Sequence, residues 1–361
     1  MPCVGGPSGV TSTLLHPLPA HWVVAFVKSM PSKRGLTLGK FAPLHKGHQL
    51  LIETALGEMD EVLAIIYDCP QTTPVPLTVR ANWIRSLYPT VQVIEARDGP
   101  TEVGASEEIK RRHEDYILNT LKLREITHFY SSEFYGDHMS RALGAVNRIV
   151  DADRKTISVS ATEIRNDPFT FREYLDRRVY RDLVTNVVFL GAPSTGKTTM
   201  AERMAREYAT SWMPEYGREY WHQHQVNRRL SPVQLEDLAE QHLVREEDRL
   251  GQANRFLFTD TNAITTYMFS LAYHAIATPR LEELAGQAAS RYDLMFVCDT
   301  DIPHEDTWDR SGDVNRQTFQ KHVLTDLARR KVPFVMLRGD LEGRVQQVKT
   351  ILDKFEKFAA K

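Results

Sequence analysis

The stretch Gly191-Ala192-Pro193-Ser194-Thr195-Gly196-Lys197-Thr198 decides the fold of the second half of the chain, because it fits the pattern G-x-x-x-x-G-K-[ST]. The apolar run 187–190 precedes it and predicts a buried strand, and residues 198–208 follow with helical spacing of apolar side chains. A strand, a glycine-rich loop and a helix in this order are typical of a phosphate-binding loop, whose backbone N–H groups attract phosphate. The sequence therefore predicts a site for ATP or GTP.

Several residues in and near this loop are expected to contact the nucleotide. Lys197 would reach the β- and γ-phosphates, and the Thr198 hydroxyl would bind Mg²⁺. A strand predicted at 256–260 ends in Asp260, which we expect to hold Mg²⁺ directly or through water. The predicted nucleotide-binding residues of the loop are Gly191, Ser194, Thr195, Gly196, Lys197, Thr198 and Thr199.

Length and composition limit the class of protein. The 361 residues are enough for about two domains, and the formal net charge of −2 gives no general attraction to nucleic acid or to anionic lipid. The three cysteines lie far apart, which fits a reducing compartment. No apolar run approaches the length of a membrane span. We therefore expect a cytoplasmic protein that acts on small molecules, with no nucleic-acid or membrane partner; a homo-oligomer is left open.

Residues 1–34 differ from the rest of the chain. They are rich in Gly, Pro, Ser and Thr, and the sequence has no Asp or Glu before Glu53. The match to a transit peptide or a secretion signal is weak, because basic residues are few and late and a cleavage site is lacking. We expect a disordered tail, or a translation start that lies at Met30.

From Gly35 onward, the N-terminal half shows the alternating strand and helix patterns of an α/β fold. A strand predicted at 36–39, a helix with apolar residues between Leu51 and Met59, and a strand at 61–67 form a β-α-β unit, which implies a parallel sheet. Further strands are predicted at 91–96, 126–131 and 148–151. Ligands of such sheets bind at the carboxyl ends of the strands.

A second anion site is predicted at Gly39-Lys40-Phe41-Ala42-Pro43-Leu44-His45-Lys46-Gly47-His48, between the first strand and the first helix. Two histidines three residues apart at a helix start can face one phosphate, and Gly47 permits close approach of the backbone. Lys40 adds an ammonium group that would stabilise charge during attack at phosphorus. The alternative is that the histidines merely cap the helix or bind a stray metal ion.

These motifs resemble those of a known family. The pattern G-x-F-x-P-x-H-x-G-H resembles the signature of the nucleotidyltransferases related to class I aminoacyl-tRNA synthetases, and Ser160, Thr162 and Arg165 match that family's second signature, S-x-T-x-x-R. With a P-loop domain after them, they resemble the NadR-type bifunctional proteins, and residues 150–154 and 214–218 support the resemblance, which covers Gly35 to the C-terminus. Enteric members open with a helix-turn-helix repressor module; we expect none before Gly35 and carry over no repressor function.

The resemblance implies two three-layer α/β domains: a Rossmann-like nucleotidyltransferase domain at 35–183 and a P-loop kinase domain at 184–361. The kinase domain would phosphorylate ribosylnicotinamide to nicotinamide mononucleotide (NMN). The first domain would then transfer the adenylyl group of ATP to NMN, giving NAD and pyrophosphate. The implied cofactors are ATP and Mg²⁺. Whether the pyridine ring is the amide or the acid stays open.

The resemblance also assigns residues in the first domain. His45 and His48 would contact the triphosphate near the reacting phosphorus, and Lys40 and Arg165 would hold its outer phosphates. Trp83 either stacks on nicotinamide or belongs to the core. The assisting residues are Gly39, Phe41, Ser160 and Thr162.

In the second domain, Glu215 or Asp260 would accept the proton of the 5′-hydroxyl group, and the sequence leaves the two open. Tyr216 and Arg218 are expected at the substrate. A polar segment at 306–316 resembles a lid that would close Arg310 and Arg316 over the transferring phosphoryl group, with Trp308 against the nicotinamide ring.

Two alternatives remain at this stage. The same folds would also suit another substrate pair, such as phosphopantetheine and dephospho-coenzyme A. A nucleotide sensor with one vestigial site is the other alternative.

Overall fold

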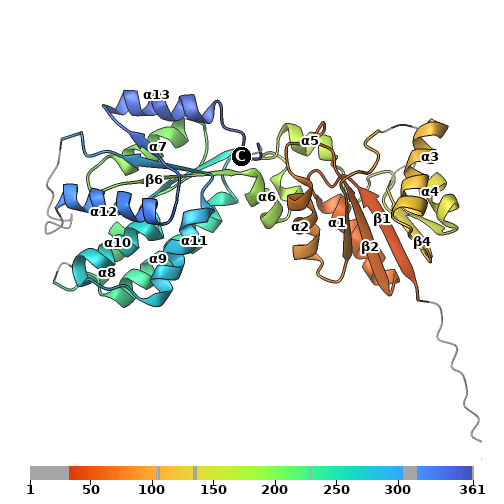
Figure 1. Cartoon of the computed structure of the whole chain (residues 1–361), viewed down its shortest axis with the longest axis horizontal. Helices are drawn as coiled ribbons and strands as arrows, with labels where there is room; N and C mark the ends of the chain where they lie inside the picture. Colours follow the sequence, from red (N-terminus) through yellow and green to blue (C-terminus); the bar gives the residue numbers. More distant parts are fainter. Residues whose placement is uncertain are drawn as a thin grey trace, which may run out of the picture. The chain divides into compact units, whose positions relative to one another are not determined.

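The computed structural model of the chain describes residues 32–102, 104, 106–132, 136–227, 229–303 and 315–359. The tail expected at 1–34 therefore lies outside the described residues except for 32–34. The described part of the chain builds two separate parallel sheets, each with five strands and with helices packed on both faces (Figure 1).

The first sheet has the strand order β3-β2-β1-β4-β5, and each neighbouring pair is parallel. Because the chain moves outward from β1 first to one side and then to the other, the carboxyl end of β1 beside β4 is the switch point at which such sheets bind ligands. Its strands are β1 (Arg34–Gly39), β2 (Glu61–Tyr67), β3 (Gln92–Ala96), β4 (His128–Ser131) and β5 (Val146–Ile149).

Alternating side chains of the strands supply both faces of this sheet. Val62, Ala64 and Ile66 of β2 pack with α1 and α2, whereas Leu63 and Ile65 pack with the helices after β3 and β4. The helices of this part are α1 (Lys46–Glu58), α2 (Leu77–Leu87), α3 (Glu107–Asp115), η1 (Tyr116–Thr120), α4 (Gly136–Leu143), α5 (Ala161–Asn166), η2 (Arg172–Tyr174) and α6 (Arg177–Leu183).

The second sheet has the order β10-β9-β6-β8-β7 and is again parallel throughout. Strand β6, which leads into the glycine-rich loop, lies between β8 and β9, and Phe189 is in register with Asp260. The pairing therefore brings the end of β8 beside the loop. The strands are β6 (Thr185–Leu190), β7 (Trp212–Met213), β8 (Phe256–Asp260), β9 (Leu294–Cys298) and β10 (Val335–Leu337).

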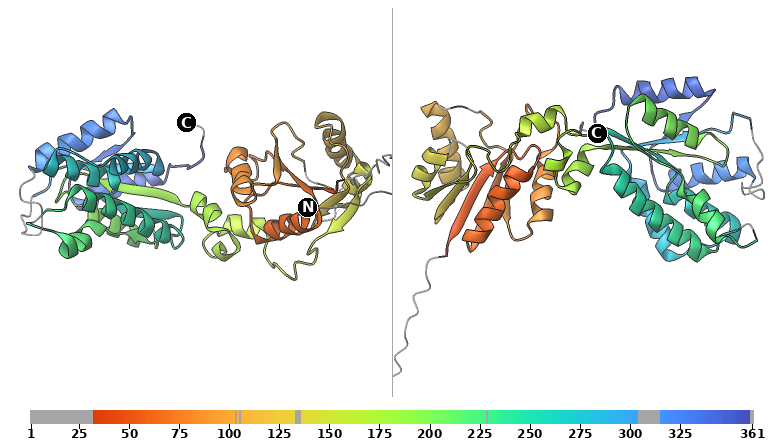
Figure 2. Two further views of the ribbon diagram at one scale, coloured as in Figure 1. Left: turned by 90° about the horizontal axis from the view of Figure 1, so that it is seen from below. Right: turned by 180° about the vertical axis from the view of Figure 1, so that it is seen from behind.

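Two helical layers cover this sheet. Helices α7 and α13 pack on the face formed by Phe189, Phe258 and Phe296, and the other helices pack on the face formed by Val188 and Val297 (Figure 2). The helices are α7 (Lys197–Glu207), α8 (Tyr216–His224), α9 (Pro232–Leu250), α10 (Ala263–His274), α11 (Pro279–Arg291), α12 (Arg316–Arg329) and α13 (Leu341–Leu352).

Local sequence explains where these helices begin. Ser231 caps α9 by accepting a hydrogen bond from the Gln234 N–H group, with Pro232 as the first helical residue. Thr278 and Pro279 start α11 in the same way, and Asn262 caps α10. Each cap supplies an acceptor for a backbone N–H group that the helix itself leaves unpaired.

The predicted class, two α/β domains with parallel sheets, is confirmed, and most predicted strands agree with the structure within two residues. The strand predicted at 148–151 begins earlier, at Val146, because Val146 to Ile149 pair with β4. The last helix, α13, ends at Leu352. The segment before β6 forms two short helices, η2 and α6.

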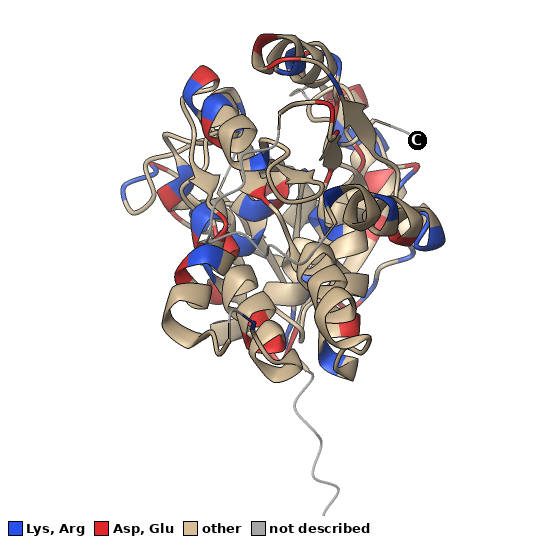
Figure 3. Ribbon diagram, turned by 90° about the vertical axis from the view of Figure 1, so that its left-hand side faces the viewer, with Lys and Arg blue, Asp and Glu red and all other residues tan. Residues whose placement is uncertain are grey.

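Charge is distributed without one dominant sign. Basic and acidic segments alternate along the helices in the view of Figure 3, in keeping with the net charge of −2. Among the described residues, no helix is both long and apolar enough to cross a membrane.

Candidate active sites

The two histidines of the first site form the N-terminal cap of α1. His45 is the capping residue, and its Nδ1 accepts a hydrogen bond of 3.1 Å from the Gly47 N–H group. The His45 N–H group in turn donates to Nδ1 of His48 at 3.4 Å. Since a backbone N–H can only donate, both Nδ1 atoms are acceptors, and each neutral ring carries its proton on Nε2. Capping therefore fixes the tautomer that leaves an Nε2–H donor on each ring.

Burial keeps both rings uncharged near neutral pH. It lowers the pKa of His45 from 6.5 to about 4, and the positive charge of Arg154 acts in the same direction. The pKa of His48 also lies well below 6.5, because of burial and of its neighbour His45, against an opposing effect of the Pro43 carbonyl. The sequence analysis gave Arg154 no role; its charge reaches this site from the loop after β5.

Close packing holds the two rings in place. Their centroids are 3.8 Å apart, and the ring of Phe41, which is buried, lies 4.9 Å from that of His48. A Cβ atom on Gly47 would lie only 3.0 Å from the His45 ring, so a side chain at this position would displace that ring. Gly39 ends β1 directly before this loop.

The second signature lies against the same loop. Arg165 donates from Nη1 to the Ala42 carbonyl at 2.7 Å and from Nη2 to the Thr162 hydroxyl at 2.8 Å. Ser160 is the N-cap of α5, and its hydroxyl group is bonded to Glu163. The structure thus brings Arg165 to the histidine loop, whereas the Ser160 hydroxyl is already engaged in the cap.

A buried arginine that the sequence analysis missed supports this site. Arg80, on α2, is fully buried and donates to the carbonyl groups of Lys40, Tyr67 and Val75. These carbonyls belong to the loop after β1, to the last residue of β2 and to the segment before α2, so one guanidinium group fixes the loop of Lys40 against the end of β2. Lys40 itself donates from Nζ to the Thr72 hydroxyl at 3.0 Å.

Trp83 does not belong to this site. Its side chain is 2% exposed, and its Nε1–H group donates to an Asp182 carboxylate oxygen at 2.8 Å. The interpretation of Trp83 as a platform for nicotinamide is therefore wrong, and the core alternative holds: its position on α2 turns it into the hydrophobic cluster with Leu77 and Ile84.

The glycine-rich loop of the second site connects β6 to α7 as predicted. Gly191 has φ +134°, and a Cβ atom there would lie 2.6 Å from the Cys298 carbonyl oxygen. Gly196 precedes α7 with φ +85°. Lys197 is buried, and its ammonium group donates to the Ala192 carbonyl at 2.9 Å, as does the Thr195 hydroxyl at 2.8 Å. The loop is therefore closed on itself around the Ala192 carbonyl.

Side chains from distant segments hold this loop in shape. Gln320 accepts from the Ala192 N–H group at 2.8 Å, and Arg344, which is buried, donates to the Thr195 carbonyl at 2.7 Å. Arg316 donates to the carbonyls of Ser194 at 2.9 Å and Ile302 at 3.0 Å. Arg316 thus binds the loop itself, in addition to any part that it plays at a phosphoryl group.

Asp260 lies beside the start of α7. Its Oδ2 accepts a hydrogen bond of 2.5 Å from the Thr198 hydroxyl, and its Oδ1 is buried with no hydrogen-bond partner among the described residues. Burial, and then the negative charge of Glu215, raise the pKa of Asp260 from 3.8 to about 7. A carboxylate oxygen without a partner next to a threonine hydroxyl fits the ligand set that Mg²⁺ has in nucleotide sites.

A cavity of about 650 Å³ extends from this loop. It is bounded at the loop by Ser194, Gly196 and Thr199, and by Glu215 and Arg218 from the start of α8. Its aromatic lining residues are Trp221, Phe269 and Tyr273, and the sequence analysis assigned none of them. They come from α8 and α10, which lack a recognisable motif.

Tyr216, which was expected at the substrate, does not line this cavity. It is 6% exposed, its hydroxyl donates to Gln241 at 2.7 Å, and its ring lies 3.9 Å from the Arg245 guanidinium. Helical geometry turns it toward α9 while its neighbours Glu215 and Gly217 face the cavity. Trp308 and Arg310 lie outside the described residues.

Family models match both parts of the chain. A cytidylyltransferase-like model matches residues 36–167, and a model described as an AAA domain matches residues 186–344. The first match spans both signatures of the histidine site, and the second spans the glycine-rich loop, Asp260 and Arg344.

Whole-length relatives carry both parts in the same order. The chain is 25% identical over 331 residues to the trifunctional NAD biosynthesis/regulator protein NadR of Salmonella typhimurium strain LT2, covering 86% of this chain and 80% of that protein. It is also 25% identical to the protein of that name from Escherichia coli K12, covering 85% of this chain and 79% of that protein.

Two crystal structures share the fold. NadR in complex with NAD and AMP-PNP (23% identity) and NadR in complex with NR (24% identity) each cover 91% of this chain and 97% of theirs, with a TM-score of 0.53. The order of the two matched domains, the motifs within them and the relatives that align over most of this chain agree, and the chain is similar to NadR proteins in both of its parts.

Proposed function

We propose that the chain makes NAD in two ATP-dependent steps. The P-loop domain, proposed at 184–361, phosphorylates ribosylnicotinamide to NMN, and the nucleotidyltransferase domain, proposed at 35–183, joins NMN to the adenylyl group of ATP. One observation carries the proposal: a single chain holds both a capped histidine pair at the end of β1 and a P-loop beside a buried carboxyl at the end of β8. The relatives named for NAD biosynthesis support this substrate class.

In the adenylyl transfer, an NMN phosphate oxygen attacks the α-phosphorus of ATP and pyrophosphate leaves. The Nε2–H groups of His45 and His48 would donate to the triphosphate as neutral imidazoles, because their Nδ1 atoms are held by the helix cap. Lys40 and Arg165 would neutralise the outer phosphates. No covalent enzyme intermediate is needed, so catalysis is positioning and charge stabilisation.

In the phosphoryl transfer, the 5′-hydroxyl oxygen of the riboside attacks the γ-phosphorus and ADP leaves. We assign the base to Glu215, because Glu215 lines the cavity whereas Asp260 is fully buried and bonded to Thr198. Lys197 would leave the Ala192 carbonyl to bind the outer phosphates. Arg310 would add positive charge at the transferring group.

Asp260 and Thr198 are the residues proposed to hold Mg²⁺. When bound, the ion neutralises charge on the β- and γ-phosphates. The described residues contain no cluster of three or more His, Cys, Asp or Glu side chains suited to a metal, so phosphate oxygens and water would complete the ligand set.

We place the reaction in the cytoplasm. Cys69 and Cys298 are buried free thiols, as expected for a reducing compartment.

The test is product analysis with a set of acceptors. The chain is incubated with ATP, Mg²⁺ and either ribosylnicotinamide, NMN, phosphopantetheine or dephospho-coenzyme A. The proposal predicts NMN from the first and NAD from the second. Turnover of the pantetheine compounds without NAD formation would replace it with the coenzyme A pair, and tight ATP binding without any product would indicate a sensor.

A further inference from the structure

A buried histidine on α9 lies at the wall of the P-loop cavity. His242 is 7% exposed and lines the cavity together with Glu215, Leu238 and Thr265. Its Nε2 is buried and has no hydrogen-bond partner among the described residues. The groups assigned to the two reactions leave this side chain unexplained.

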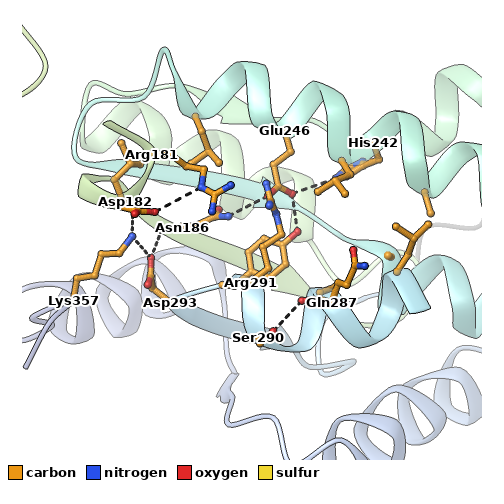
Figure 4. A pocket seen from close by; sticks show the side chains of 18 residues that line it. Arg181, Asp182, Asn186, His242, Glu246, Gln287, Ser290, Arg291, Asp293 and Lys357 are labelled. Carbon is orange, nitrogen blue, oxygen red and sulfur yellow. Dashed lines mark hydrogen bonds and ion pairs between the residues drawn. The ribbon is translucent and has the colours of Figure 1, made fainter. Parts of the chain in front are cut away.

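The carboxylate of Glu246 lies near the His242 ring and is held in place by hydrogen bonds. Figure 4 shows His242 and Glu246, one turn apart on α9, at a second pocket of about 380 Å³ on the other side of the histidine. Glu246 is completely buried and accepts hydrogen bonds from Asn186 at 3.1 Å, Arg291 at 2.6 Å and the Tyr292 hydroxyl at 2.6 Å. These three partners prevent the carboxylate from turning away.

The carboxylate selects a tautomer of His242. Nε2 lies 4.0 Å from the nearer Glu246 oxygen, Oε2. Burial lowers the pKa of His242 in spite of that negative charge, so the ring is neutral at pH 7. A single ring proton is most stable on the nitrogen that faces the carboxylate, and Nδ1 is then a hydrogen-bond acceptor.

The position of His242 along the cavity follows from the packing of α9 against α10. His274, at the end of α10, contacts the Leu230 carbonyl at 2.8 Å, just before α9 begins, so the two helices run antiparallel. His242 follows Leu230 by 12 residues and Asn262 precedes His274 by 12 residues, so His242 is level with the start of α10. Thr265 in the first turn of α10 lines the same cavity, whereas Phe269 and Tyr273 lie farther along the helix.

This arrangement orders the cavity from end to end. The P-loop and Glu215 form the phosphoryl end, and the aromatic side chains of α8 and α10 form the far end. A riboside whose 5′-oxygen faces the P-loop and whose ring reaches the aromatic end has its sugar between them. Among the α9 residues that line this cavity, His242 is the polar one.

We propose that His242 is a specificity-determining residue of the kinase site, whose Nδ1 accepts a hydrogen bond from a 2′- or 3′-hydroxyl group of the riboside. The Glu246 carboxylate, 4.0 Å from Nε2, favours the tautomer that carries its proton on Nε2. This inference rests on the proposed function of the P-loop domain. A buried acceptor left unpaired by a substrate without that hydroxyl group discriminates strongly against it. The histidine would thus distinguish ribosides from deoxyribosides.

The test pairs protein variants with substrate analogues, in the full chain. His242→Leu removes the polar atoms at similar volume, and His242→Asn keeps a polar atom near the position of Nδ1. Each variant is assayed with ribosylnicotinamide and with its 2′-deoxy and 3′-deoxy analogues. The KM for ATP and the adenylyl transfer from ATP to NMN serve as controls for folding.

In the unaltered chain, removing the recognised hydroxyl group should raise the riboside KM about tenfold, the effect of one lost hydrogen bond with a buried partner. His242→Leu should raise the KM for ribosylnicotinamide by a similar factor, and the same hydroxyl deletion should then have no further effect. His242→Asn should recover most of the affinity, and the KM for ATP should stay the same.

Two results would overturn the inference alone: a riboside KM that stays within twofold in His242→Leu, or an increase that is the same for the riboside and both deoxy analogues. The latter would mean that His242 only packs the cavity wall. No phosphorylation of ribosylnicotinamide by the unaltered chain would overturn the proposed function itself, and the inference with it.

Discussion

The Thr198 hydroxyl donates a hydrogen bond of 2.5 Å to Oδ2 of Asp260, which joins the first turn of α7 to the end of β8. The register of β6 with β8 creates this contact, since Asp260 is paired with Phe189, one residue before β6 ends at Leu190. The second oxygen, Oδ1, is buried without a partner among the described residues. We propose this pair as the magnesium site, and an ionised buried carboxylate oxygen without a partner destabilises the folded state.

Burial of the Asp260 carboxylate predicts that Asp260→Asn changes the stability of the fold by an amount that depends on pH. A carboxyl group whose pKa is raised from 3.8 to about 7 binds a proton more tightly in the folded state, so it destabilises the fold increasingly as the pH rises from about 4 to 7. Asp260→Asn should therefore stabilise the Mg²⁺-free chain at pH 8, by at most about 4 kcal/mol, and much less at pH 4.5. Thermal unfolding at both pH values measures this. Asp248→Asn, at an exposed ion pair, is the control and should show no such pH dependence.

The two sites should be separable by substitution. Lys197→Ala should lower NMN formation by about 10²- to 10³-fold and spare NAD synthesis from NMN, because the lysine belongs only to the P-loop. His48→Ala should do the reverse. Both steps are measured separately on each variant by chromatography of the products. A folded variant that loses both activities would contradict the division into two sites.

The assignment of the base predicts a split in kinetic constants. Glu215→Gln should lower kcat for ribosylnicotinamide phosphorylation by about 10²- to 10⁴-fold and leave the KM for ATP nearly unchanged, because Glu215 lines the cavity as the proposed base for the acceptor hydroxyl and is not assigned to the nucleotide. Steady-state kinetics with each substrate varied in turn give both constants. An unchanged kcat would move the role to Asp260.

The cap of α1 predicts that adding one methyl group at Gly47 slows adenylyl transfer. Gly47→Ala brings a Cβ atom to 3.0 Å from the His45 ring, so it should displace that ring and lower adenylyl transfer more than tenfold. Gly57→Ala, in the same helix and with nothing within 4 Å of the new Cβ, is the matched control. It should leave the rate unchanged and stabilise the helix by about 0.5–1 kcal/mol.

Arg80 should matter to both stability and adenylyl transfer. Arg80→Lys removes the planar fork that reaches three carbonyl groups, so we expect a loss of about 3 kcal/mol in the free energy of unfolding and slower NAD synthesis. Arg85→Lys on the same helix, at an exposed ion pair with Glu95, is the control. Urea unfolding measures the free energy of unfolding, and a separate adenylyl transfer assay measures the rate of NAD synthesis. Equal effects of the two substitutions would contradict the role of Arg80 in fixing the loop of Lys40.

The sequence predicted the parts of the sites that lie in contiguous motifs. The loop at 191–198 and the histidine segment at 39–48 carry their own strand, turn and helix signals, so their positions could be derived residue by residue. A role for Arg165 at the triphosphate was implied only by the family pattern, and its hydrogen bond to the Ala42 carbonyl was not expected.

The remaining site residues depend on packing between distant segments. Arg80 reaches the carbonyl of a residue 40 positions earlier, and Arg344 reaches that of Thr195, 149 positions away. Nothing in the local pattern around either arginine marks it as buried. Likewise, Tyr216 and Glu215 are adjacent in sequence, and only the packing of α8 on α9 decides which of them faces the cavity.

The central claim, two ATP-consuming sites in one chain, is tested most directly by a single time course. The unaltered chain is supplied with ribosylnicotinamide, ATP and Mg²⁺, and ADP and pyrophosphate are measured together with the pyridine products. We predict that ADP and NMN appear first and that NAD follows with one pyrophosphate for each NAD. ADP and NMN without NAD or pyrophosphate, or no pyridine product at all, would contradict the account.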